Sequence, residues 1–164
     1  TLAPLPLAIE LRHASFLETG PGGGLPFLAS LGVGFVNIDL PRSNTSPPPT
    51  SITTSDIGYF RLHGRNRSKW FDRRATRDEK YDYRYSLDEL ASLLPLIDAI
   101  ARHARATYVI TNNHFRGQAP ANALELAELL SARRSPNALG TTSPGDPRAD
   151  RDATGDARRH GETP

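Results

Sequence analysis

The sequence lacks both cysteine and methionine, and aromatic residues make up only 7% of it. Without cysteine the chain has no disulfide bond, thiolate nucleophile or thiolate metal site, which is compatible with a cytoplasmic protein. No apolar run approaches the roughly 18 residues that a membrane-spanning helix needs. The start has no charged segment followed by an apolar one, so no secretory signal is expected. Because position 1 is not methionine, we also expect the chain to be a fragment.

The formal net charge of +2 is too small to predict that the whole chain attracts nucleic acid. The kind of basic residue is more informative, because Lys69 and Lys80 are the only lysines among 20 basic residues. The planar guanidinium group of arginine suits phosphate and carboxylate ligands. A GC-rich genome would produce the same preference, so composition leaves both explanations open.

Four segments predict β-strands, because each is short, rich in β-branched, aromatic or leucine residues, and bounded by Gly, Pro, Ser or Asn. They are residues 7–12, 33–40, 57–63 and 107–112.

Two helices are predicted clearly. Ser86 and Glu89 form the capping box that begins the first one. Pro95 interrupts it and predicts a kink or a break. The second helix is expected to begin near Pro120, a residue suited to a first helical turn, and to continue to about residue 130. The apolar stripe of the first helix is Leu87, Leu90, Leu94, Ile97, Ala101 and Ala104.

The connections between the predicted strands indicate the fold class. A weaker helix at 26–31 lies between the first two strands, and the first clear helix lies between the last two. Residues 41–56 contain no helical pattern. This alternation predicts an α/β fold with parallel βα units. From residue 133 to 164 the chain is polar and poor in apolar residues, which predicts a disordered low-complexity tail.

Each predicted strand ends in polar residues, and its amino-terminal part is apolar. In parallel sheets and barrels, ligands bind beyond the carboxyl ends of the strands, so four polar ends are expected to meet in one pocket. A buried polar network that satisfies only itself is the alternative. The pairs are Glu10 and Arg12, Asn37 and Asp39, Arg61 and His63, and Asn112 and His114.

The residue types suggest roles for these groups. Glu10 and His63 are the candidates for acid–base catalysis. The expected substrate-binding residues are Arg12, Asn37, Asp39, Arg61, Arg65, Asn112, Asn113 and His114. A metal site built from Glu10, Asp39, His63 and His114 would have suitable ligand types. Its spacing in sequence gives no support, so no metal site is predicted and the cofactor is left unknown.

The segment 65–74 is basic and contains Trp70 and Phe71. It could close over a ligand or clamp phosphates, or it could be a solvated charged loop with an aromatic anchor. The sequence has no Walker phosphate loop, and Gly22-Gly23-Gly24 does not follow a strand as a dinucleotide-binding loop would.

Several blocks resemble a known family. They are Glu10-Leu-Arg-His13, Arg61-Leu-His-Gly-Arg65, Tyr81-Asp-Tyr-Arg-Tyr-Ser86, and Asn112-Asn-His114 followed by Ala119-Pro-Ala-Asn-Ala123. In this order and spacing they are similar to the signature blocks of the YecE-like "domain of unknown function 72" family. The resemblance covers roughly residues 5–131. Phe16, the insertion at Gly20–Gly24 and Pro95 depart from the family pattern.

The resemblance implies a TIM-barrel-like fold, of which residues 1–132 would be the C-terminal part, about half of a full barrel. It implies no reaction. The leading hypothesis is an enzyme of hydrolase or isomerase type that acts on a small anionic substrate, phosphorylated or sugar-like. One alternative is a nucleic-acid-binding module that uses the basic loop 65–74. Another is a truncated, non-catalytic remnant. No membrane partner is expected, and the oligomeric state is left open.

Overall fold

The computed structural model describes residues 5–20 and 22–134. Most of the expected disordered tail falls on residues 135–164, which lie outside the described residues. The last described helix continues to Arg134, two residues past the expected domain boundary at 132.

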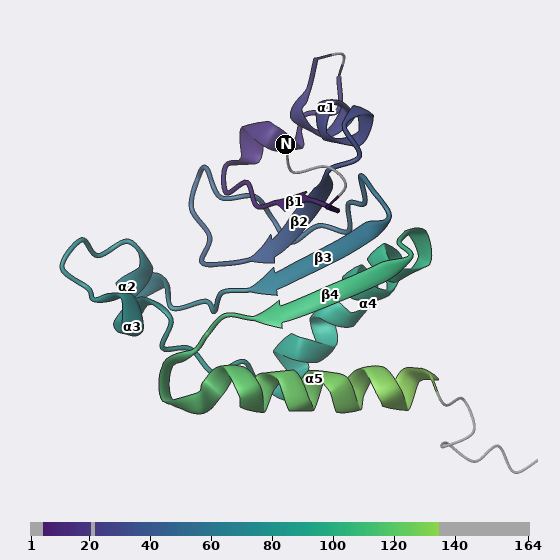
Figure 1. Ribbon diagram of the computed structural model, residues 1–164. Coiled ribbons are helices and arrows are strands. Elements are labelled where there is room, and N and C mark those ends of the chain that lie inside the picture. Colours follow the sequence, from purple (N-terminus) through teal and green to yellow (C-terminus); the bar gives the residue numbers. More distant parts are fainter. Residues whose placement is uncertain (1–4, 21, 135–164) are drawn as a thin grey trace, which may run out of the picture.

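The four described strands form one parallel sheet in the order β1-β2-β3-β4 (Figure 1). The strands are β1 (Ala8–Ile9), β2 (Gly34–Asp39), β3 (Ile57–Leu62) and β4 (Ala106–Thr111). The predicted α/β class with parallel strands is therefore confirmed. The first strand is much shorter than the predicted 7–12, because the chain leaves the ladder after Ile9 and turns into the short 3₁₀ helix η1 (Ala14–Leu17).

The helices lie mostly where the sequence predicts them. They are α1 (Gly24–Ser30), α2 (Arg67–Trp70), α3 (Arg77–Lys80), α4 (Leu87–His103) and α5 (Gln118–Arg134), with a 3₁₀ turn η2 at Phe115–Gly117. Residues 41–56 contain no helix, as expected. Among the residues with assigned structure, no helix combines the length and apolar character needed to cross a bilayer. The two short helices α2 and α3 were not predicted.

The start of α4 follows the predicted capping box. The amide of Glu89 donates to Ser86 Oγ at 3.2 Å, and the amide of Ser86 donates to Glu89 Oε2 at 2.9 Å. Of the predicted kink or break at Pro95, the break is wrong, because α4 is one helix through that position. Pro95 has no backbone N–H to donate to the preceding turn. The burial of the apolar face of α4 on β3 and β4 stabilises the helix and offsets this loss. Leu87 belongs to the predicted stripe but is exposed, since it stands in the first turn.

Helices α1, α4 and α5 pack on one face of the sheet, and α2 and α3 lie beyond the carboxyl ends of the strands (Figure 1). Partner residues of a parallel ladder point to the same face, and Phe60 and Leu62 of β3 point toward α4. Each large apolar side chain buried there stabilises the fold by roughly 1.5–3 kcal/mol. The core of this layer consists of Phe60, Leu62, Tyr85, Leu90, Leu93, Leu94, Ile97, Ile100 and Leu126.

An extended segment takes the place of a helix between β2 and β3. The side chain of Asn37 ties it to the sheet: Nδ2 donates to the carbonyls of Ile52 (2.8 Å) and Tyr59 (3.1 Å). Its Oδ1 accepts from the amide of Ile52 (2.8 Å) and from Thr50 Oγ1 (2.6 Å). Asn37 is fully buried, so its amide holds the extended segment.

The other face of the sheet is open over β3 and β4, whereas at β2 Trp70 of α2 packs against Val36, Ile38 and Leu40. Tyr108 and Ile110 of β4 lie on this open face and are 51% and 39% exposed. In the register, Tyr59 stands beside Tyr108 and Arg61 beside Ile110, so β3 contributes to the same surface. An eight-stranded barrel would bury such a face in its interior.

Gly58 of β3 lies directly against α4. A Cβ placed there would lie 2.3 Å from Ile100 Cγ2 and 2.7 Å from Thr107 Oγ1. We predict that Gly58→Ala lowers the free energy of unfolding by about 1–3 kcal/mol, because α4 must move away from β3. Urea denaturation would measure this change.

Gly20→Ala is the matched control, because a Cβ at Gly20 meets no atom within 4 Å. Equal stability losses in the two variants would contradict the assigned packing of α4 on β3.

Candidate active site at the carboxyl rim

Polar side chains from three strand ends meet on the open face of the sheet. Arg61 Nη1 donates to Glu10 Oε2 at 2.6 Å, and His63 Nε2 lies 3.1 Å from Glu10 Oε1. Asn112 Nδ2 lies 3.1 Å from His63 Nδ1, and Arg12 Nε donates to Glu10 Oε1 at 2.5 Å. We call these five residues the rim cluster. It joins the end of β1 to the ends of β3 and β4.

His63 forms the centre of the rim cluster, and its side chain is fully buried. When the amide of Asn112 donates to Nδ1, the neutral imidazole carries its proton on Nε2 and donates it to Glu10. Asn112 and Glu10 thus hold the imidazole from its two sides.

The Glu10 carboxylate is the shared hydrogen-bond acceptor of the basic side chains in the rim cluster. Burial raises the pKa of Glu10, but hydrogen bonds and charges from His63 and Arg12 outweigh this and lower the pKa from 4.5 to about 2. The side chains of Arg12 and Arg61 remain 47% and 28% exposed. The site thus presents two guanidinium groups to solvent around an ionised carboxylate.

Aromatic rings pack around His63 on the side of the basic loop. The ring centroids of Trp70 and Tyr81 lie 6.0 Å and 6.1 Å from that of His63, and 5.3 Å from each other in an edge-on arrangement. Arg12 lies over the Trp70 ring, 5.9 Å from its centroid. These rings hold the imidazole in place and give the cluster an apolar wall.

Asp39 lies at the same rim, but on the opposite face of the sheet from Arg61. The expectation that all four polar ends share one pocket is wrong for β2. The ladder pairs Ile38 with Arg61 and Asp39 with Leu62, so Asn37 and Asp39 point to the face that the helices cover.

A second group of polar residues surrounds Asp39, which is buried. Arg65 forms two hydrogen bonds with its carboxylate, from Nε (2.8 Å) and Nη2 (3.0 Å), and Tyr85 Oη donates a third (2.6 Å). Arg65 Nη1 also donates to Glu89 Oε1 (3.2 Å), which accepts from Tyr83 Oη (2.5 Å). We call these residues the Asp39 network.

The charges in the Asp39 network shift the pKa of several members. Burial raises the pKa of Tyr85, and the Asp39 carboxylate raises it further. Burial and the hydrogen bond to Glu89 raise the pKa of Tyr83 to about 12. Burial lowers the pKa of Arg65, but the bonds to Asp39 raise it more. Both phenols therefore stay protonated and act as hydrogen-bond donors at neutral pH.

Asn113 lies apart from the rim cluster, and His114 reaches only its edge, where its Nδ1 lies 3.2 Å from the Asn112 carbonyl and its ring 5.1 Å from that of Tyr81. Asn113 is buried and donates to the carbonyl of Tyr83 and to Asn122 Oδ1, both at 2.8 Å. His114 is exposed and lies 3.3 Å from Asp78 Oδ1. Asn113 thus fixes the end of β4 to the segment before α4.

Several residues that build the two groups were not predicted from the sequence. Tyr81, Tyr83 and Tyr85 alternate along one extended segment, and Asn122 of α5 accepts from the amide of Tyr85 at 3.1 Å. The alternation of tyrosines was the available signal. Nothing in the sequence indicated that Asn122, on a helix, would bond to that segment.

The four residues considered as metal ligands are not brought together. Glu10 and His63 are in the rim cluster, Asp39 is bonded to Arg65, and His114 lies beside Asp78. In the part of the chain with described coordinates, no three His, Asp or Glu side chains are grouped so that they could hold a metal ion.

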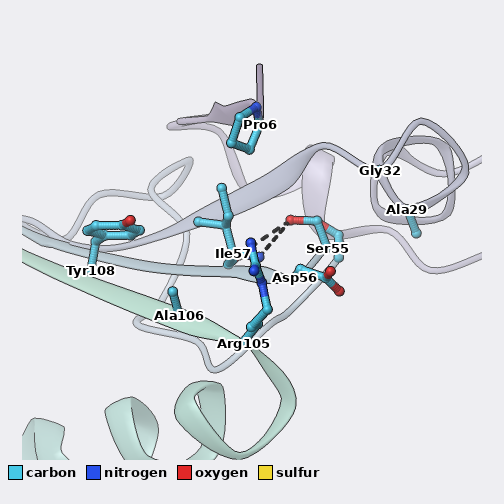
Figure 2. A pocket seen from close by; sticks show the side chains of 10 residues that line it. Pro6, Ala29, Gly32, Ser55, Asp56, Ile57, Arg105, Ala106 and Tyr108 are labelled. Carbon is cyan, nitrogen blue, oxygen red and sulfur yellow. Dashed lines mark hydrogen bonds between the residues drawn. The ribbon is translucent and has the colours of Figure 1, made fainter. Parts of the chain in front are cut away.

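A hollow of about 510 Å³ lies at the opposite, amino-terminal rim (Figure 2). It is lined by residues around the first positions of β3 and β4, including Ile57, Arg105 and Ala106. Inside it, Ser55 Oγ accepts from the amide of Ile57 at 3.2 Å. None of the sequence-predicted site residues lines this hollow.

A parallel sheet with helices on one face and ionisable groups at its carboxyl rim defines an α/β protein with a candidate active site. The family described as "Protein of unknown function DUF72" has a model that matches residues 1–148, and the chain belongs to this family. This confirms the resemblance seen in the sequence blocks.

Known relatives agree with this assignment. The chain is 26% identical to the UPF0759 protein YunF of Bacillus subtilis (strain 168) over 140 residues, which is 82% of this chain and 50% of that protein. A DUF72 family protein from Thermotoga maritima MSB8 is 40% identical, with a TM-score of 0.69 over 78% of this chain and 47% of that one. One from Enterococcus faecalis V583 is 30% identical, with a TM-score of 0.70 over 79% and 49%. The chain spans about half the length of these relatives.

The phenol of Tyr85 is predicted to stabilise the Asp39 network. It donates to Asp39 and accepts from the amide of Gly64 at 2.9 Å, so Tyr85→Phe leaves two buried groups short of a partner. We expect a loss of about 1–3 kcal/mol in the free energy of unfolding, measured with urea. Tyr108→Phe removes the phenol of an exposed tyrosine and should change stability by less than about 0.5 kcal/mol. A loss as large in the Tyr108 variant would argue against this role.

The lowered pKa of Glu10 predicts a dependence of stability on pH. A carboxyl group with a lower pKa in the folded chain stabilises the fold above its unfolded pKa. For Glu10 this contribution is lost as the pH falls from 4.5 to about 2. Glu10→Gln should therefore weaken the decline of the urea midpoint across this window. An unchanged decline, or an NMR titration midpoint of Glu10 near 4.5, would be inconsistent with the ion pairs of the rim cluster.

Proposed function

We propose that the rim cluster is an acid–base site for a small anionic substrate, of phosphorylated or sugar-like type. The observation that carries this proposal is the meeting of Glu10, Arg61, His63 and Asn112 from three strand ends within hydrogen-bond distance. Ligands of parallel α/β sheets bind at this end of the strands.

Arg12 and Arg61 provide the anion-binding groups. Both are partly exposed, and both now donate to Glu10. Guanidinium groups bind phosphate and carboxylate through paired hydrogen bonds. An arriving anion competes with Glu10 for these donors, so binding of the substrate weakens the contact with Arg12, one of those that lower the pKa of Glu10.

Glu10 is then the base that takes a proton from the substrate. Its carboxylate becomes a carboxylic acid in this step, and the same group can return the proton to a neighbouring atom. His63 is buried and contacts Glu10, so it acts as a positioning residue whose imidazole stabilises the charged carboxylate. Asn112 orients the imidazole from its other side. This proton exchange is chemistry that an isomerase or a hydrolase would use.

The alternative of nucleic-acid binding rests on the basic loop. Arg65 is paired with Asp39, and Lys69 lies 3.4 Å from Glu79, so both charges are already partnered. Trp70 packs against His63 and Tyr81, which supports a structural role for its ring. The remaining exposed cations of the segment are Arg67, Arg73 and Arg74.

Substitution of Arg61 tests the proposal. The 164-residue chain would be titrated with a panel of sugar phosphates and hydroxy acids, with binding followed by NMR. We expect at least one member to bind saturably, and Arg61→Gln to weaken that binding by at least about tenfold because a charged hydrogen bond is lost.

Arg102→Gln is the control, because Arg102 is exposed near the end of α4, away from the rim cluster. A panel without any saturable ligand, or equal affinities for Arg61→Gln and the unchanged chain, would overturn the proposal. Binding of single-stranded RNA that is lost in Arg73→Gln/Arg74→Gln but kept in Arg61→Gln would favour the nucleic-acid alternative.

A further inference from the structure

A second hollow, of about 440 Å³, opens beside the Asp39 network at the carboxyl ends of β2 and β3. Three arginines line it: Arg42, Arg65 and Arg67. We call it the arginine hollow. Asp39 also lines it, and the ladder register places Asp39 on the opposite face of the sheet from the rim cluster.

The arginine hollow carries uncompensated positive charge. Asp39 is its one acidic lining residue, and the carboxylate of Asp39 is occupied by Arg65 and Tyr85. Arg42 and Arg67 are exposed and form no ion pair with any residue in the described ranges 5–20 and 22–134. Two guanidinium forks are therefore free to bind a ligand.

The remaining lining is apolar and stiff. Leu40, Pro41 and Pro49 complete the hollow. Proline rings fix the backbone angle φ, so this surface loses little conformational freedom when a ligand settles on it. A ligand that fits the hollow has a negatively charged group that binds the arginines and a compact apolar part that packs on the prolines.

We propose that the arginine hollow binds a small organic phosphate. A phosphomonoester carries a charge near −2 at neutral pH, which two unpaired guanidinium groups match better than they match the single charge of a carboxylate. The site also gives a role to part of the basic loop, because Arg65 and Arg67 belong to that segment. This proposal does not depend on acid–base chemistry at the rim cluster.

Phenyl phosphate is a suitable probe, because it joins a phosphate to a compact apolar ring. The 164-residue chain would be titrated with phenyl phosphate and, separately, with benzoate, by calorimetry and by NMR of the arginine side-chain N–H signals. We expect saturable binding of phenyl phosphate that shifts the signals of Arg42 and Arg67, and binding of benzoate that is at least about fivefold weaker.

Paired variants locate the binding. Arg42→Gln/Arg67→Gln should lower the affinity for phenyl phosphate by at least about tenfold, whereas Arg102→Gln should leave this affinity unchanged. Both substituted arginines are exposed, so the double variant should keep the circular dichroism spectrum of the unchanged chain. No saturable binding, undiminished binding by the double variant, or equal binding of benzoate would overturn the assignment.

The Arg61→Gln variant separates this site from the rim cluster. Binding at the arginine hollow should survive in Arg61→Gln. If phenyl phosphate is instead lost in Arg61→Gln and kept in Arg42→Gln/Arg67→Gln, the phosphate binds at the rim cluster, which would overturn the assignment and support the proposed function.

Discussion

A buried carboxylate needs hydrogen-bond donors, and the arrangement around Asp39 follows from that need. Asp39 ends β2 on the covered face of the sheet, and its side chain is buried. Arg65 comes to it from the loop after β3, and Tyr85 from the segment before α4. The hydrogen bonds that Asp39 needs therefore position the loop after β3, the segment before α4 and the start of α4.

The backbone near Tyr85 shows how closely these parts fit. Gly64 has a φ of +89°, and a Cβ there would lie 2.8 Å from Tyr83 Cβ, so the turn after His63 requires glycine. The amide of Gly64 donates to the Tyr85 phenol, and Asn122 holds the Tyr85 backbone from α5. As a result, His63 leaves β3 in a fixed direction, toward Glu10.

The two faces of the sheet therefore have different roles at one rim. The covered face holds the Asp39 network, in which charges are neutralised and phenols stay protonated. The open face holds the rim cluster, in which an ionised Glu10 keeps two partly exposed arginines close. The matched part of the chain spans about half of the relatives' length, so they have further chain beyond this sheet.

Sequence patterns predicted the strands, the main helices and the polar character of every strand end. They predicted that all four polar ends would meet, whereas three do, because alternation relates side chains only within one strand. The relation between β2 and β3 depends on register, which here pairs Ile38 with Arg61 and separates Asp39 from Arg61. The contacts of Tyr85 and Asn122 could not be predicted from the sequence either, since they join distant segments through single hydrogen bonds.

The extended segment over β2 has one further consequence. A helix in that place would have its own backbone hydrogen bonds. This segment is held instead by the Asn37 side chain, by the Thr54 hydroxyl, which bonds to β2, and by the packing of Ile52. Asn37 thus fastens the extended segment to β2 through hydrogen bonds to Ile52. Release of this segment would leave the β2–β3 ladder and the core under α4 in place, so the amides of Phe35 and Ile52 are expected to exchange through a local opening before global unfolding.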